Sequence, residues 1–301
     1  MKIVAVTWGR NCAATLPRAV DSVLGQSYGN VDYYLVDNAS DDNTLEIMNR
    51  YAASYERVKV VANSQNDMRV LFTLLPDFYA RYSDDDALII LDADDEYTAD
   101  CFQSLADSIG EQDFLCCGSD ILDAESGDLI EQRTCAYPNK PFFMQIYNFL
   151  RTFWGKLIPF RTLKRCSFDI PAEMVYGIDT LFALEVYKNS ENYGVLPGTH
   201  HRYYLSRKSV SYRFEPLRFK WDLLIADRAF ATLEARGELT AANRDYIRKV
   251  RSGAMWETSR AISRSGKALQ IPALLLKTGA LPYFIYDTIS QICNKYFWRK
   301  K

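Results

Sequence analysis

The sequence predicts an α/β protein with a doubly wound, mixed sheet and a helical C-terminal extension. Short apolar segments alternate with amphipathic helix candidates through the first 120 residues, a pattern typical of helices that cover both faces of a sheet. The apolar run 87–91 contains no polar alternation, which indicates a strand buried on both faces, as in a parallel sheet. From residue 217 to about 265, helical spacing dominates.

The elements of the first 120 residues follow from local signals. Pro17 suits the first turn of a helix that stops at Gly25. Asn43 and Glu46 resemble a capping box that opens a second helix, and Pro76 predicts a break in a third. The predicted strands are 2–7, 33–36, 58–61, 87–91 and 114–119, and the predicted helices are 17–24, 43–55, 68–82 and 98–109.

After residue 120 the pattern is looser. Residues 154–157 predict a short strand or loop, and 179–189 predict an amphipathic helix. Residues 200–212 are polar, aromatic and basic, and 217–265 read as arginine-rich helix. The segment 271–298 is apolar but interrupted by prolines, a glycine and a lysine, and it is followed by cations. It fits either a membrane interface or a helix docked on the core.

Charge is distributed unevenly along the chain. The net charge is −2, but the residues through Arg151 include 25 acidic and 11 basic side chains, and the remainder includes 13 acidic and 25 basic ones. An acidic first half suits a metal, and a basic second half suits phosphates or an anionic membrane surface. The alternative is two oppositely charged faces that complement each other. Nothing resembles a nucleic-acid-binding module.

Cysteine usage and hydropathy bear on the compartment. Seven cysteines without a C-x-x-C pair indicate a reduced protein with neither a disulfide framework nor a zinc site. The apolar run at residues 3–6 is too short for a signal-peptide core, and no run approaches the ~20 residues of a membrane-spanning helix. We therefore expect a cytoplasmic protein, with peripheral binding to the inner face of the plasma membrane left open.

Acidic residues crowd the end of the fourth predicted strand. Asp92, Asp94, Asp95 and Glu96 follow directly on the run 87–91. Carboxylates this close repel one another unless a cation neutralises them, and ligands of open α/β sheets bind beyond the carboxyl ends of strands. The cluster predicts a Mg²⁺ or Mn²⁺ site for a phosphorylated ligand. A solvated acidic turn is the plain alternative.

Several motifs now occur in one order. The segments are 16–28 (LPRAVDSVLGQSY), 34–44 (YLVDNASDDNT) and 91–95 (LDADD). Together they resemble the nucleotide-sugar-binding half of a family-2 glycosyltransferase with a GT-A fold. The resemblance is close over 1–61 and 84–110 and looser to about 213. Asn38-Ala39 replaces the usual Asp-Gly, and the family's usual arginine-containing stretch is not recognisable in 63–81.

The resemblance implies three segments and a donor site. Residues 1–120 would bind the nucleotide sugar, 121–213 would form the acceptor half of the same domain, and 214–301 would be mostly helical. Asp37 would accept a hydrogen bond from the base, usually uracil, and Asp95 would hold the loop or the donor sugar. The other donor-side residues would be Thr7, through its backbone, with Arg10, Arg69 and Lys156, together with Asp92 on the ribose or sugar and Asp94 on the metal.

On the acceptor side, the resemblance implies a catalytic base. Asp179 in the segment 176–182 (YGIDTLF) matches the family's base position, although an Asp there is also an ordinary helix cap whose pKa the helix N-terminus would lower. Lys156 could instead be a surface lysine. His201 could be a further metal ligand beside Asp94 and Asp92, or a structural histidine. Arg207 and Lys208 could hold an acceptor phosphate or face water.

The resemblance thus implies an inverting glycosyltransferase. It would move a sugar from a nucleoside-diphosphate donor, UDP-linked by expectation, to a hydroxyl of a glycan or lipid-linked glycan, as in bacterial surface polysaccharide synthesis. A non-catalytic cation-binding scaffold with a decayed transferase fold remains the alternative. A sugar nucleotidyltransferase fits less well, because only Gly9-Arg10 is available where a Gly-rich phosphate loop is expected.

Overall fold

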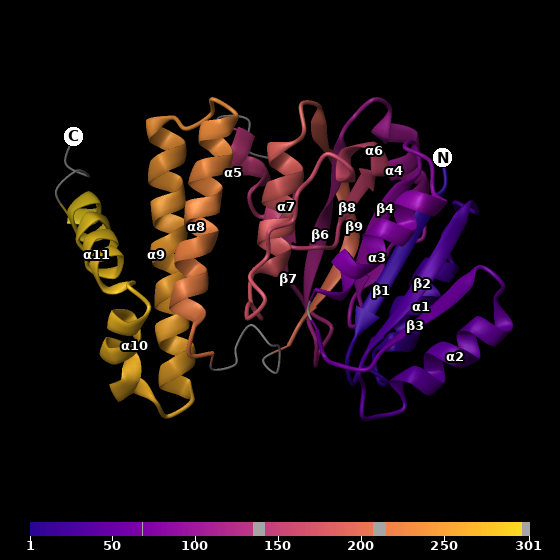
Figure 1. The fold of residues 1–301 in the computed structure, drawn as a ribbon, viewed down its shortest axis with the longest axis horizontal. Helices are drawn as coiled ribbons and strands as arrows, with labels where there is room; N and C mark the ends of the chain where they lie inside the picture. Colours follow the sequence, from indigo (N-terminus) through magenta and orange to yellow (C-terminus); the bar gives the residue numbers. More distant parts are fainter. Residues whose placement is uncertain (68, 135–141, 207–214, 297–301) are drawn as a thin grey trace.

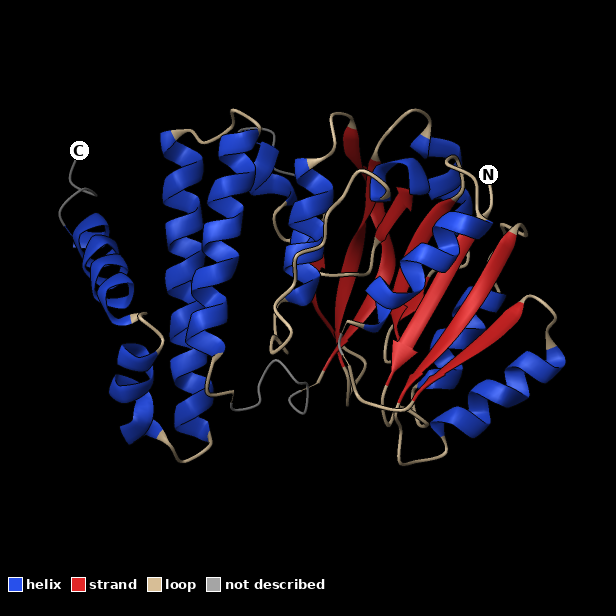
Figure 2. Cartoon of the chain, viewed as in Figure 1, coloured by secondary structure: helices blue, strands red, loops and turns tan. Residues whose placement is uncertain are grey.

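The computed structural model describes residues 1–67, 69–134, 142–206 and 215–296. Arg207, Lys208 and the cationic end of the chain therefore lie outside the described residues. A mixed sheet forms one end of the molecule, and the C-terminal helices α8 to α11 form the other (Figures 1 and 2). The predicted fold class is confirmed.

The sheet joins a parallel half to a mixed half. Its order is β3-β2-β1-β4-β8-β6-β9-β5, with β7 paired to β6. The first four strands of that order run parallel, while β8 is antiparallel to both β4 and β6. The strands are β1 Ile3–Gly9, β2 Val31–Asn38, β3 Val58–Asn63, β4 Ala87–Asp92, β5 Glu96–Tyr97, β6 Phe114–Asp123, β7 Leu129–Arg133, β8 Lys156–Pro159 and β9 Tyr193–Leu205.

Helices cover the sheet and continue beyond it. The α-helices are α1 Leu16–Leu24, α2 Thr44–Ser54, α3 Val70–Arg81, α4 Cys101–Ile109, α5 Phe142–Ile146, α6 Phe160–Leu163, α7 Ile178–Lys188, α8 Arg218–Ala235, α9 Ala241–Arg264, α10 Ile271–Lys277 and α11 Leu281–Tyr296. Two short 3-10 helices are η1 Phe149–Arg151 and η3 Ala268–Gln270. No helix of the described part has both the length and the apolarity that crossing a membrane requires.

Two apolar cores lie on opposite faces of the sheet, as alternation along buried strands requires. Cys116 packs into the core that α3 and α7 cover, and its neighbour Cys117 packs into the core that α1 and α4 cover. The two cysteines therefore point to opposite faces of the sheet. A third, smaller core of Phe219, Met255 and Ile262 holds the C-terminal helices together. Cys12, Cys101, Cys116, Cys117 and Cys166 are free thiols.

Two local expectations were wrong. Helix α3 runs through Pro76 without a break. The side chain of Asn43 makes no capping bond, because Asp42 Oδ1 accepts from the Thr44 amide at 3.0 Å instead. The polar segment from residue 200 belongs to the long strand β9, which pairs with β6 across a register shift near Gly118. Strand pairing overrides composition in that segment.

Candidate active site

The carboxyl ends of three parallel strands place the predicted residues at one edge of the sheet. The strand register pairs Trp8 with Asp92 and Gly9 with Asp37. The turn after β4 can approach β1 closely because Gly9 has no side chain. A Cβ there would lie 2.7 Å from Cys12 Sγ and 2.8 Å from Ala93 Cβ, closer than van der Waals contact allows.

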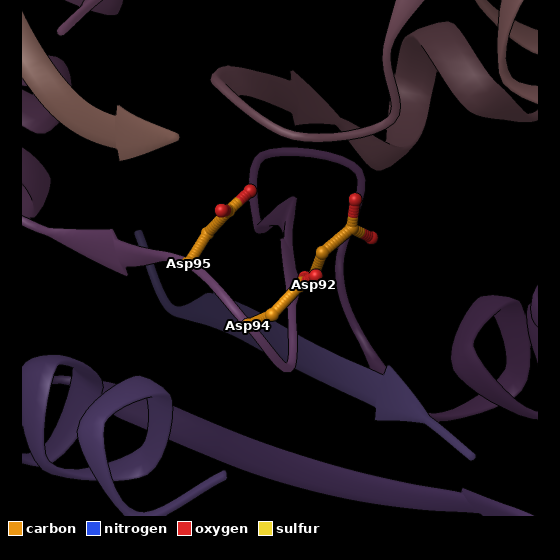
Figure 3. Close-up of side chains that lie close together, drawn as sticks. All are labelled: Asp92, Asp94 and Asp95. Atoms are coloured by element: carbon orange, nitrogen blue, oxygen red, sulfur yellow. The ribbon is translucent and has the colours of Figure 1, made fainter. Parts of the chain in front are cut away.

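The turn after β4 gathers three carboxylates. Asp92, Asp94 and Asp95 each offer one oxygen, and these oxygens lie within 4.8 Å of one another. Figure 3 shows the three side chains on this turn. Asp94 is exposed, Asp92 is partly buried and Asp95 is fully buried. The cluster therefore opens to solvent on the Asp94 side.

Burial and mutual repulsion disfavour the charged forms of this cluster. Burial raises the pKa of Asp92 well above its ordinary value, and the charges of Asp95, Asp94 and Asp179 raise it further. Burial likewise raises the pKa of Asp95, with Asp94 adding to the effect. A divalent cation would relieve this repulsion and favour ionisation.

The donor atoms fit a hard divalent cation. Trp8 Nε1 donates to Asp92 Oδ1 at 2.9 Å, and the Tyr204 amide donates to Asp95 Oδ1 at 2.9 Å, which orients both carboxylates. Asp95 Oδ2 is buried without a hydrogen-bond partner among the described residues. An all-oxygen set with an unsatisfied buried oxygen suits Mg²⁺ or Mn²⁺.

His201 lies behind the cluster. It is fully buried, its ring stacks on Trp154 with centroids 4.0 Å apart, and its Nε2 lies 3.5 Å from Asp95 Oδ2. It is not one of the three residues whose ligand atoms converge. Burial lowers the pKa of His201 to about 3, so the imidazole is neutral. Its role as a metal ligand stays a prediction.

Two buried donor-side residues have different environments. Asp37 is 2% exposed, and its Oδ2 accepts from the Ser40 amide at 3.3 Å. Its Oδ1 is buried and lacks a partner in the described part of the chain, so a base N–H could satisfy it. The Thr7 hydroxyl accepts from Tyr33 at 2.8 Å inside the sheet, and the Thr7 residue is fully buried between β2 and β4. Its part in the nucleotide pocket stays a prediction.

The arginines predicted on the donor side are paired with neighbouring loops. Arg10 donates to the Ala39 carbonyl at 3.0 Å and to Asp41 at 2.7 Å. Ala39 has a φ of 60°, the left-handed conformation that glycine adopts most easily, so the replacement of the family's usual glycine keeps the loop shape. Arg69 donates to both carboxylate oxygens of Asp67.

Lys156 is a buried lysine, which corrects the surface alternative. It is 1% exposed, and its Nζ donates to the Thr152 carbonyl at 2.6 Å, the Thr152 hydroxyl at 3.0 Å and the Trp154 carbonyl at 3.0 Å. Burial lowers its pKa, while the charges of Asp179 and Asp92 oppose that shift. Lys156 is thus near enough to Asp179 and Asp92 for electrostatic interaction, but its ammonium group is hydrogen-bonded to the loop before β8.

Asp179 stands in the first turn of α7, after Gly177 at a φ of 79°. Its Oδ1 accepts from the Thr180 amide at 2.8 Å. Burial raises the pKa of Asp179 and outweighs the opposing effects of this hydrogen bond, Arg151 and Lys156. The expectation that the helix N-terminus lowers this pKa was therefore wrong in its net direction. A raised pKa suits a general base.

The sequence-based prediction missed two cations at this site. Arg18 on α1 donates to the Asp94 carbonyl, and its guanidinium lies 3.6 Å from the ring centroid of Tyr204. Arg151 on η1 acts electrostatically on Asp179. Arg18 did stand inside the first recognised motif, but its partners lie more than 70 positions away, so spacing alone could not reveal them.

The fold and this site define a glycosyltransferase. Residues 3–169 match the model of Glycosyl transferase family 2, and the chain belongs to this family. EpsE of Bacillus subtilis (strain 168), which carries a glycosyltransferase name, is 46% identical over 57 residues. That segment is 19% of this chain and 20% of EpsE.

Solved structures with low sequence identity share the fold. S. aureus TarS 1–349 in complex with UDP-GlcNAc superposes with a TM-score of 0.66 at 15% identity, covering 99% of this chain and 93% of that one. The chain spans 54% of the longer TarS structure. The mannosyltransferase PcManGT from Pyrobaculum calidifontis, in complex with GDP-Man and Mn²⁺, gives a TM-score of 0.52 at 16% identity, covering 100% and 88% of the two chains.

Proposed function

We propose that this chain transfers a sugar with inversion from a UDP-sugar to a hydroxyl of a glycan or lipid-linked glycan. The observation that carries the proposal is the convergence of Asp92, Asp94 and Asp95, whose oxygens lie within 4.8 Å of one another. Asp179 is near enough to Asp92 to act on it electrostatically. A base beside a cation site is the arrangement that direct displacement at a sugar carbon needs.

On the donor side, Asp94 and Asp92 would hold Mn²⁺ or Mg²⁺, and His201 would act as a further ligand only if it moved out from behind Asp95. When bound, the cation supplies charge neutralisation for the departing diphosphate. The buried Oδ1 of Asp37, which lacks a hydrogen-bond partner among the described residues, would accept a hydrogen bond from the nucleobase of the donor and so orient it. Arg18 contacts the Asp94 carbonyl and would add positive charge beside the departing diphosphate.

On the acceptor side, Asp179 would take the proton of the acceptor hydroxyl. That oxygen forms a bond to the anomeric carbon as the bond from this carbon to the diphosphate oxygen breaks, and the bonding pair leaves with the nucleoside diphosphate. Attack opposite to the leaving group inverts the configuration. No covalent enzyme intermediate is required, so no cysteine takes part.

Ligand binding and transfer test this function separately. We expect UDP with Mn²⁺ to raise the melting temperature of the wild type, because a ligand that binds only the folded state stabilises it. Asp94→Ala should abolish the joint shift. Asp179→Asn should keep it but lower sugar transfer by about 10²–10⁴-fold, the usual contribution of a general base.

A screen of UDP-, GDP- and dTDP-sugars, with release of the nucleoside diphosphate as readout, identifies the donor. Absence of a joint UDP–Mn²⁺ shift in the wild type would contradict the proposed donor site. A normal shift without transfer to any acceptor would favour the non-catalytic scaffold instead.

We further propose peripheral binding of the C-terminal helices to an anionic membrane surface. Large apolar side chains are exposed along η3, α10 and α11, which form the end of the molecule farthest from the sheet (Figure 1). They are Leu269, Leu276, Tyr283, Ile285, Tyr286 and Ile289. Lys267 precedes η3 and Lys277 is the last residue of α10, and cations beside apolar side chains suit anionic lipid.

A further inference from the structure

A cavity adjoins Asp179 on the side of the C-terminal helices. It has a volume of about 120 Å³ and lies between η1, the start of α7, α8 and α9. Tyr147, Arg151, Tyr176, Asp179 and Arg251 contribute to its lining. This volume corresponds to about four water molecules, which is room for one small charged group and not for a whole sugar ring.

Arg151 is the unusual member of this lining. The residue is exposed to solvent, yet it faces Asp179, Tyr147 and Tyr176 closely enough for electrostatic interaction. No hydrogen bond or ion pair joins Arg151 to any residue that the structure describes. Its guanidinium carries five N–H donors that a planar oxyanion can engage two at a time.

The other polar groups of the cavity are held in place. The guanidinium of Arg251, the other arginine of the lining, lies 4.7 Å from the ring centroid of Tyr283. Arg218, which is not part of the lining, lies 4.2 Å from the ring centroid of Tyr176. Asp222 accepts from the Thr258 hydroxyl at 2.7 Å. The hydroxyls of Tyr147 and Tyr176 make no hydrogen bond to another described residue, so they too can donate to a bound group. Because Arg151 has no hydrogen bond or ion pair to a described residue, its guanidinium can bind a ligand without breaking such a contact.

We propose that this cavity is an acceptor subsite for an oxyanion, a phosphate ester or a carboxylate, gripped by Arg151 with help from Tyr147 and Tyr176. The inference rests on the proposed transferase function, because the subsite adjoins Asp179. An acceptor that places its anionic group here would present a nearby hydroxyl to the Asp179 carboxylate. The acceptor would then be a phosphate-bearing or uronic-acid-bearing glycan.

The test measures anion binding without catalysis. Methyl phosphate, glucuronate and neutral methyl glucoside are titrated into the full chain in EDTA and followed by ligand-observed NMR. We expect Arg151→Gln to weaken binding of the preferred anion about tenfold or more, because a charge-assisted bidentate contact is lost. The two anions distinguish a phosphate from a carboxylate acceptor.

The controls separate a subsite from general charge attraction. Arg260→Gln removes a cation from the exposed face of α9 and should leave anion binding unchanged. Arg151→Lys keeps the charge but loses the planar donor pair, so it should bind with intermediate affinity. UDP–Mn²⁺ binding by each variant reports that the fold and the donor site are intact.

Equal anion binding by the wild type and Arg151→Gln, or no anion binding by the wild type, would overturn the subsite. Loss of binding in Arg260→Gln as well would show general charge attraction and also overturn it. Failure of UDP–Mn²⁺ binding in the wild type would count instead against the proposed function, so the two failures are distinguishable.

Discussion

At the scale of single residues, Asp222 shows how burial sets a pH response. It is 3% exposed on α8, and burial raises its pKa from 3.8 to about 6, against the opposing effects of Thr258, Arg218 and Arg151. Between about pH 4 and pH 6, the unfolded carboxyl is ionised while the folded one keeps its proton. The contribution of Asp222 to the free energy of unfolding therefore falls as the pH rises through that window.

We expect Asp222→Asn to match the wild type at about pH 4 and to be more stable at about pH 8. The gain should be as much as about 3 kcal/mol, since each pKa unit corresponds to about 1.4 kcal/mol. Asn can still accept from the Thr258 hydroxyl. Urea denaturation at both pH values measures the difference. A less stable Asn variant at high pH would mean that the arginines stabilise the ionised form.

Single residues also show which parts of the site were predictable. The Asp92–Asp95 cluster and Asp37 were visible because strand ends in a parallel sheet meet at one edge. Arg18 and Arg151 could not be predicted as site residues, because the groups they act on lie in distant segments of the chain. The burial of Lys156 was not predictable either, because it depends on the loop that the lysine holds.

At the scale of elements, strand β6 depends on a close approach that only glycine permits. Gly118 lies at the register shift between β6 and β9. A Cβ there would lie 2.2 Å from the Gly198 carbonyl oxygen and 2.7 Å from the Arg133 carbonyl oxygen. Both contacts are with backbone, so neither can be relieved by a side-chain rotation.

We expect Gly118→Ala to lower the free energy of unfolding by about 2 kcal/mol or more, because overpacking forces the backbone to shift. Gly253 on α9 is the matched control, since a Cβ there meets nothing within 4 Å. Gly253→Ala should stabilise the protein by about 0.5–1 kcal/mol through helix propensity. Chemical denaturation of both variants tests the pair, and equal effects would contradict the argument.

At the scale of the whole molecule, the C-terminal helices present the proposed membrane surface at the end opposite the sheet (Figure 1). Exposed apolar side chains cost little in a small patch, and beside cations they suit the proposed binding to a membrane interface. The charge asymmetry of the chain, basic in its second half, is consistent with attraction of that end to anionic lipid.

We expect the protein to co-sediment with vesicles containing anionic lipid more than with zwitterionic vesicles. The combined change Leu276→Ser, Ile285→Ser and Ile289→Ser should reduce this binding, because it removes apolar area from the surface. Leu129→Ser with Ile130→Ser removes exposed apolar side chains from β7 and serves as the control. Equal loss in both sets would count against this surface. Unchanged partitioning after deletion of residues 291–301 would show that the cationic end of the chain is not needed for it.

The sequence by itself determined the alternating elements of the first 120 residues, the family and the carboxylate cluster. These depend on local spacing and on the rule that parallel strands end at one edge. The tertiary structure decided the insertion of β8 between β4 and β6 and the burial of Lys156 and His201. It also decided that Asp179 lies near enough to Asp92 and Arg151 to interact with them electrostatically. Pairings across such sequence separations are selected by packing of the whole chain, and no local pattern encodes them.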